Sequence, residues 1–198
     1  MSAQPSTCPA WAGHDRGNGC GLFHWGDGHP APAGDPPGLE AFTHGAVREA
    51  LRHIVGVQLR NLATVGGSIY SRFGFSDVLT LFLAMDCSVE LYKGGIVPLR
   101  EYAERPYDRD IVVRLLVRKE AADYCYQSVR NSQTDIPVLT CAAARLQDGS
   151  YRFAVGARPL KAVLYEEPAA PAQQLAETIQ QQVVTGSNMR GSADTAAT

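Results

Sequence analysis

The chain has 198 residues, 45% of them hydrophobic, so its length and composition suit one domain or two small ones. Its 18 basic and 20 acidic residues give a net charge of −2, and this balance offers no electrostatic reason to expect a nucleic-acid partner. No apolar run reaches the ~18–20 residues of a membrane span. The N-terminus also lacks the basic and apolar regions of a secretory signal, so we expect a cytoplasmic protein.

The five cysteines do not form a metal-binding pattern. Their number is odd, their spacings are long, and no CxxC pair occurs, so neither a zinc site nor an iron–sulfur cluster is expected on this chain. Cys87, Cys125 and Cys141 lie in apolar segments, and we expect them to be buried thiols. No triad of nucleophile, histidine and carboxylate can be assembled, and no nucleophile elbow occurs, which disfavours a hydrolase.

Residues 1–37 differ in composition from the rest of the chain. They are rich in glycine, proline, histidine and tryptophan and show no apolar periodicity, which is typical of a disordered segment. From residue 39 to 55 apolar side chains recur at helical spacing, so this segment is predicted to be an amphipathic helix. A glycine-rich turn is predicted next, and Ser76 or Asp77 then begins a strongly apolar helix that reaches about Met85.

The second half of the chain is predicted to consist mainly of antiparallel strands. Lys93-Gly94-Gly95 is predicted to be the turn of a hairpin, and a β-rich run follows at 110–117. Further strands are predicted at 124–129, 136–145 and 151–156, the last two joined by a turn at 147–150, with a short element at 160–164 and a helix at 171–184. Strands and helices do not alternate strictly, so the predicted fold class is α+β.

The segment 60–68 reads Arg-Asn-Leu-Ala-Thr-Val-Gly-Gly-Ser and is the most informative motif of the chain. Adjacent glycines allow successive backbone N–H groups to point into one concavity, which can bind an anion or a polar cofactor edge. Asp77 could hold a ribose hydroxyl or cap the following helix. An ordinary turn followed by an ordinary N-cap is the alternative interpretation. The segment matches neither of the common phosphate-binding motifs.

Several motifs in order resemble one known family. These are the helix ending at 57–61, the segment 63–68, Ser76-Asp77, the Leu-rich helix into Met85-Asp86, and the strand pair around 89–91. They continue with Asp110-Ile111-Val112-Val113, with Tyr126, Arg130 and Asp135-Ile136, with Gly156-Ala157-Arg158-Pro159, and with the closing segment 187–193. Together they resemble the FAD-binding subunit of molybdenum hydroxylases, the medium subunit of the xanthine dehydrogenase and carbon monoxide dehydrogenase type.

The resemblance implies a fold and a domain organisation. Residues 38–120 would form the second half of a two-subdomain FAD-binding domain of the PCMH or vanillyl-alcohol-oxidase type. Residues 121–194 would form the small α+β C-terminal domain of the family, with an antiparallel sheet and helices.

The resemblance also implies a role in electron transfer. In this family, substrate is hydroxylated at a molybdopterin centre on a large partner subunit, and electrons pass through 2Fe–2S clusters on a small partner subunit. FAD on the medium subunit delivers them to NAD or another acceptor, while the protein positions and tunes the flavin. The substrate would be bound by the partner, with a purine as the leading candidate.

The FAD contacts implied by the resemblance fall into three groups. The segment around the paired glycines would contact FAD chiefly through its backbone, and Asp77 would accept a hydrogen bond from a cofactor hydroxyl. Ile111 and Val112 would pack near the isoalloxazine ring and Tyr126 near the flavin edge, although a plain core role is open for these three. No catalytic and no metal-binding residue is expected on this chain. The predicted cofactor-binding residues are Thr64, Val65, Gly66, Gly67, Ser68, Asp77, Ile111, Val112 and Tyr126.

The chain departs from the family at both ends. The family's first subdomain carries a loop near AGGTD that cradles the FAD pyrophosphate, and residues 1–37 match nothing in it. Codons for residues 22–38 and 194–198, shifted by one base, can encode family-like sequence. We therefore expect residues 1–37 and 195–198 to be frame-shifted on either side of a genuine family core. The alternative function is a remnant without flavin that acts at most as a docking module for partners.

Overall fold

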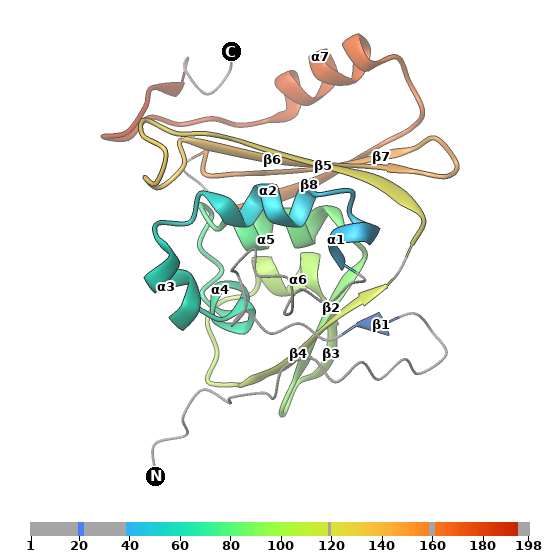
Figure 1. The fold of residues 1–198 in the computed structure, drawn as a ribbon. Helices are drawn as coiled ribbons and strands as arrows, with labels where there is room; N and C mark the ends of the chain where they lie inside the picture. Colours follow the sequence, from blue (N-terminus) through green and yellow to red (C-terminus); the bar gives the residue numbers. More distant parts are fainter. Residues whose placement is uncertain (1–19, 22–38, 119, 159–160, 194–198) are drawn as a thin grey trace.

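The computed structural model describes residues 20–21, 39–118, 120–158 and 161–193, and it consists of two antiparallel sheets with helices between them (Figure 1). Most of the expected frame-shifted residues therefore lie outside the described ones. The first sheet has the strand order β1-β4-β2-β3, and the second has the order β5-β6-β7-β8. The strands are β1 (Cys20–Gly21), β2 (Cys87–Leu91), β3 (Gly95–Pro98), β4 (Val112–Arg118), β5 (Ala122–Val129), β6 (Leu139–Leu146), β7 (Tyr151–Gly156) and β8 (Val163–Glu167).

Seven helices occur in the described part of the chain. Helices α2 and α5 lie between the two sheets, while α7 lies on the other side of the β5–β8 sheet (Figure 1). None of these helices is long and apolar enough to cross a membrane. Their bounds are α1 (Leu39–Phe42), α2 (Ala46–Arg52), α3 (Val57–Leu62), α4 (Val65–Tyr70), α5 (Asp77–Ala84), α6 (Leu99–Glu104) and α7 (Ala172–Gln182).

The predicted helix at 39–55 is interrupted. His44 and Gly45 have φ values of 50° and 91°, which lie in the left-handed region and cannot continue a right-handed helix. The Thr43 hydroxyl donates to the carbonyl oxygen of Leu39 at 2.8 Å and closes α1, and Gly45 becomes the N-cap of α2. The apolar spacing therefore predicted a helical segment correctly but could not locate the break within it.

Helix α5 begins where the sequence predicts. Ser76 is the N-cap, and its hydroxyl oxygen accepts a hydrogen bond from the backbone N–H of Leu79 at 3.2 Å. All eight residues of α5 are buried, because the helix packs between the two sheets. A helix covered on all sides must be apolar around its whole circumference, which explains the sequence Asp-Val-Leu-Thr-Leu-Phe-Leu-Ala.

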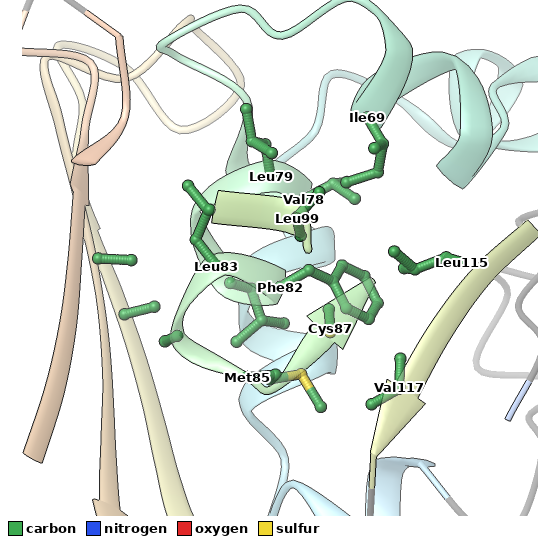
Figure 2. Close-up of a cluster of buried hydrophobic side chains, with 14 of the residues drawn as sticks. Ile69, Val78, Leu79, Phe82, Leu83, Met85, Cys87, Leu99, Leu115 and Val117 are labelled. Carbon is green, nitrogen blue, oxygen red and sulfur yellow. The ribbon is translucent and has the colours of Figure 1, made fainter. Parts of the chain in front are cut away.

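One hydrophobic cluster fills the space between the two sheets and includes residues of both. Figure 2 shows Phe82 of α5 pointing toward Leu115 and Val117 of β4, and Leu83 pointing toward the other sheet. Tyr124 and Tyr126 of β5 belong to the same cluster. The two sheets fall on either side of residue 119, so the proposed division at 120/121 separates the sheets but not the hydrophobic core.

The predicted hairpins form as expected. Strands β2 and β3 pair around Lys93-Gly94, and β6 and β7 pair around residues 147–150. Helix α6, which follows Pro98, was not predicted from the sequence, since its six residues are too few to show a clear periodicity. The α+β class with antiparallel pairing is confirmed.

One prediction about the cysteines was wrong. Cys87 is buried and Cys141 is half-buried, but Cys125 is exposed. Side chains alternate along β5, and Tyr124 and Tyr126 occupy the face that points to the core. Cys125 therefore lies on the opposite face of the sheet.

Candidate functional site

The segment 64–68 is the start of a helix, which corrects the predicted turn. Thr64 is the N-cap of α4, and its hydroxyl oxygen accepts a hydrogen bond from the backbone N–H of Gly67 at 3.0 Å. The backbone N–H of Ser68 donates to the carbonyl oxygen of Thr64 at 3.1 Å, which is the first helical hydrogen bond. The threonine cap is favourable enough to start a helix although two glycines follow.

At the start of α4 one side chain, Val65, is buried, while the glycines beside it leave the backbone accessible from solvent. Val65 is buried in the hydrophobic cluster, so only its backbone is available to a ligand. Gly67 is exposed, and a Cβ placed on Gly66 would meet no atom within 4 Å among the described residues. The first N–H groups of any helix lack intrahelical partners. A polar cofactor could therefore approach the backbone closely here.

The loop between α4 and α5 is held by one buried arginine. Arg72 has a φ of 48°, and its side chain is only 1% exposed. Its Nη1 donates to the carbonyl oxygens of Arg105 (3.1 Å) and Pro106 (2.8 Å), while its Nη2 donates to the Tyr102 hydroxyl (3.2 Å). The guanidinium also lies 4.2 Å from the centre of the Tyr102 ring. Arg72 thus ties this loop to residues 105–108, which lead toward Ile111.

Two exposed phenylalanines occupy the same loop. The rings of Phe73 and Phe75 are stacked, with centroids 5.1 Å apart and an interplanar angle of 10°. Both side chains are exposed, although they lie only four and two positions before the buried Asp77 in the chain. Sequence reasoning missed this pair, because two aromatics separated by glycine carry no signal that distinguishes a surface pair from core residues.

Asp77 lies in a buried polar cluster that joins helix α5 to the β5–β8 sheet. Its Oδ1 accepts a hydrogen bond from the Tyr126 hydroxyl at 2.5 Å, and also from Nη2 of Arg130. The side chains of Asp77 and Arg130 are 6% and 7% exposed. We call these three residues the Asp77 cluster. Asp77 is on α5 and Tyr126 is on β5, so the structure brings together two predicted site residues that lie 49 positions apart.

Tyr126 acts in this cluster as a neutral hydrogen-bond donor. Burial raises the pKa of its hydroxyl well above the ordinary value, and the neighbouring Asp77 carboxylate raises it further. The phenol therefore keeps its proton throughout the physiological pH range. The Tyr126 hydroxyl can therefore donate a hydrogen bond to the Asp77 carboxylate, whose oxygens can only accept one.

Ile111 and Val112 lie side by side at the start of β4 but face different surroundings. Ile111 precedes the strand and is 58% exposed, so a plain core role does not apply to it. Val112 is half-buried and packs against the hydrophobic cluster. The carbonyl oxygen of Ile111 accepts a hydrogen bond from the Tyr92 N–H at 2.9 Å, which fixes the backbone at this point.

Two surface grooves lie away from these residues. One of about 830 Å³ lies between the α1–α2 corner and the β5–β7 strands, and a second of about 390 Å³ lies beside α6. Neither is lined by a predicted site residue. Within the described ranges, no group of three or more His, Cys, Asp or Glu side chains could hold a metal ion.

The comparison with protein families identifies the first half of the described chain. Residues 37–119 match the family model described as the FAD binding domain in molybdopterin dehydrogenase. This match over residues 37–119 confirms the resemblance that the sequence motifs indicate. The open start of α4 is compatible with the FAD contacts expected there.

The curated relatives cover part of the chain. It is 27% identical over 122 residues to the uncharacterized protein YgfM of Escherichia coli K12, and equally so to YgfM of Escherichia coli O157:H7. The aligned part is 62% of this chain and 47% of the relative. The chain thus spans about half the length of the curated relatives it matches.

Solved structures show the same fold. Quinoline 2-oxidoreductase from Pseudomonas putida 86 superposes with a TM-score of 0.66 at 17% identity. The carbon monoxide dehydrogenases of Oligotropha carboxidovorans and Hydrogenophaga pseudoflava superpose with TM-scores of 0.68 at 16% and 20% identity. In each case the match covers 81% of this chain and 64% of the other, so it extends well beyond residues 37–119.

Proposed function

We propose that this chain is the FAD-binding electron-transfer subunit of a molybdopterin-containing hydroxylase in the cytoplasm. Electrons would arrive from 2Fe–2S clusters on a small partner subunit and leave the flavin to NAD or another acceptor. Substrate, with a purine as the leading candidate, would react at molybdopterin on a large partner subunit. The observation that carries the proposal is the family match of residues 37–119 together with the shared fold.

The proposed contacts to FAD come from separate elements of the chain. The backbone of residues 64–68 at the start of α4 would lie against a polar part of the cofactor, where Gly66 leaves room. The Asp77 carboxylate would accept a cofactor hydroxyl, with Tyr126 behind it, while Ile111 and Val112 would border the ring system. Bound FAD would supply the redox chemistry, and these residues would orient it and exclude water from it.

A titration of the purified 198-residue chain with FAD tests the proposal. Flavin fluorescence is expected to be quenched with one equivalent bound, and thermal unfolding is expected to shift upward as FAD is added. FMN and ADP, tested separately, would show which half of the cofactor this chain recognises. A chain that neither quenches flavin fluorescence nor gains stability from FAD would contradict flavin binding.

Electron transfer needs a separate test with partner subunits present. Reconstitution with the large and small subunits of a relative is expected to give NADH-dependent dye reduction that disappears when FAD is removed. Reduction that persists without this chain would contradict its place in the electron path.

A second candidate function is a docking module without flavin. The observation that favours it is exposed apolar surface on α3: Leu59 and Leu62, one turn apart, are 45% and 83% exposed, and Val57 at the start of the helix is also exposed. Exposed apolar surface of this kind is a common feature of interaction sites. Binding of partner subunits by a chain that binds no FAD would favour this candidate over the first.

A further inference from the structure

The Asp77 cluster is built asymmetrically. Tyr126 and Arg130 both donate to Oδ1 of Asp77, and neither of them engages Oδ2. The backbone of Asp77 is fixed independently, because it is the first residue of α5 directly after the Ser76 cap. One carboxylate oxygen is therefore held by the protein, and the orientation of the second oxygen follows from it.

Arg130 is itself held on several sides. Its Nη1 donates to the carbonyl oxygen of Asp135 at 2.5 Å, and its Nε donates to the Ser128 hydroxyl at 3.2 Å. The side chain of Asp135 lies 3.8 Å from Nε of Arg190 in the closing segment, and the carbonyl oxygen of Arg190 accepts from Asn131 at 2.9 Å. Ser128 and Asp135 thus hold the guanidinium independently of Asp77, and the closing segment contacts the same loop through Asp135 and Asn131.

We propose that Arg130 is a positioning residue of the flavin site, which acts through Asp77. The inference rests on the proposed function, in which Asp77 accepts a hydroxyl of FAD. Arg130 compensates the buried charge of the carboxylate and fixes its rotation, so that one oxygen stays oriented toward the cofactor. Arg130 follows directly after β5. The β5–β8 sheet then supports FAD binding through Arg130, although Arg130 itself does not contact FAD.

The chemistry of the cluster favours arginine at this position. A buried carboxylate needs a compensating charge, since an unpaired one would be strongly unfavourable. A guanidinium offers planar donors in a fixed geometry, and Arg130 uses Nη1, Nη2 and Nε for three different acceptors. Lysine would keep the charge but could not hold all three acceptors in the same arrangement.

The test measures FAD affinity of the full chain by fluorescence quenching in R130Q, R130K, D77N and the double variant D77N/R130Q. R130Q is expected to weaken FAD binding by about tenfold or more, and R130K is expected to recover part of that loss. Because Arg130 acts through Asp77, the double variant should bind FAD no more weakly than D77N alone. The matched control is R145Q, which removes an exposed arginine paired with Asp123 on the same sheet.

Each outcome decides between the inference and the proposed function. A wild-type chain that binds no FAD overturns the proposed function and the inference with it. Wild-type binding that R130Q leaves unchanged, or losses that simply add in the double variant, overturn the inference alone. Circular dichroism at the titration temperature reports folding. If R130Q is unfolded, the comparison of R130K with D77N/R130K gives the same test of additivity.

Discussion

The backbone N–H of Ala157 donates a hydrogen bond of 2.6 Å to the carbonyl oxygen of Gly74. This bond joins the end of β7 to the loop before α5, and therefore joins the C-terminal sheet to the proposed flavin site. Ala157 has a φ of 59°, in the left-handed region, so the chain reverses sharply to make the contact. Beside it, the buried hydroxyls of Thr80 and Thr140 are 3.0 Å apart.

Gly156→Ala is expected to destabilise the fold. A Cβ at this position would lie 2.6 Å from the Gly74 carbonyl oxygen and from the Thr80 and Thr140 hydroxyl oxygens. Such crowding forces the sheet and α5 apart, at a cost of about 1–3 kcal/mol or more. Denaturant unfolding measures the loss. Gly66→Ala is the control, because its Cβ meets no atom within 4 Å and its stability should be unchanged or slightly higher.

Thr64→Ala is expected to weaken helix α4. The substitution removes the oxygen that accepts from the Gly67 N–H, and loss of such a cap costs about 1 kcal/mol. Thr64→Ser keeps the hydroxyl and should retain most of the stability. Thermal unfolding of the two variants measures the difference. Equal losses in both variants would contradict a capping role and point to packing of the threonine methyl group.

Arg72→Lys is expected to be strongly destabilising, although lysine keeps the positive charge. Lysine cannot reach the carbonyl oxygens of Arg105 and Pro106 and the Tyr102 hydroxyl together, so buried acceptors lose their donors. We expect a loss of about 2–4 kcal/mol in the free energy of unfolding. Arg114→Lys, at an exposed pair with Glu90, should change stability by less than about 1 kcal/mol. Similar effects at the two sites would contradict the anchoring role.

Tyr124 is expected to make the protein less stable above pH 10. Burial raises the pKa of its hydroxyl from 10.0 to about 12. The unfolded chain then loses the proton first, so stability is complete below pH 10 and falls as the pH rises toward 12. The expected slope is about 1.4 kcal/mol per pH unit for this one group. Urea unfolding between pH 9 and 11 measures it.

Tyr124→Phe should remove the contribution of Tyr124 to the dependence of the unfolding free energy on pH. A weaker dependence remains in the variant, because burial raises the pKa of Tyr126 and Tyr102 as well. No described residue forms a hydrogen bond with the buried Tyr124 hydroxyl, so the variant should be about as stable as wild type, or more stable, at pH 7. An unchanged slope would contradict the assignment to Tyr124.

Local patterns identified several elements correctly. The Ser76-Asp77 start of α5 and the hairpins around Lys93-Gly94 and 147–150 depend on caps and turns that span only a few residues. Helix caps and hairpin turns depend on interactions within one short segment, so contacts with the rest of the chain do not alter them. The β-rich run at 110–117 likewise became β4, although the strand begins one residue after Ile111.

Other positions depended on competition between local preferences. Adjacent glycines favour a turn, but the Thr64 cap and the burial of Val65 and Ile69 together favour a helix. At 39–55 the apolar spacing is continuous, yet the chain breaks at His44-Gly45 so that α2 can pack between α5 and β5. Periodicity alone could decide neither case.

The sequence by itself determined the α+β class, the position of the apolar helix, the family resemblance and the segments that carry the proposed FAD contacts, because these depend on local composition and on motif order. Only the tertiary structure decided that Asp77 meets Tyr126 and Arg130, that Ile111 is exposed while Tyr126 is buried, and that Gly156 lies against Gly74. The contacts of Asp77 and of Gly156 join residues 49 or more positions apart. They form because burying α5 between the two sheets brings distant polar groups together, where most of them pair with one another.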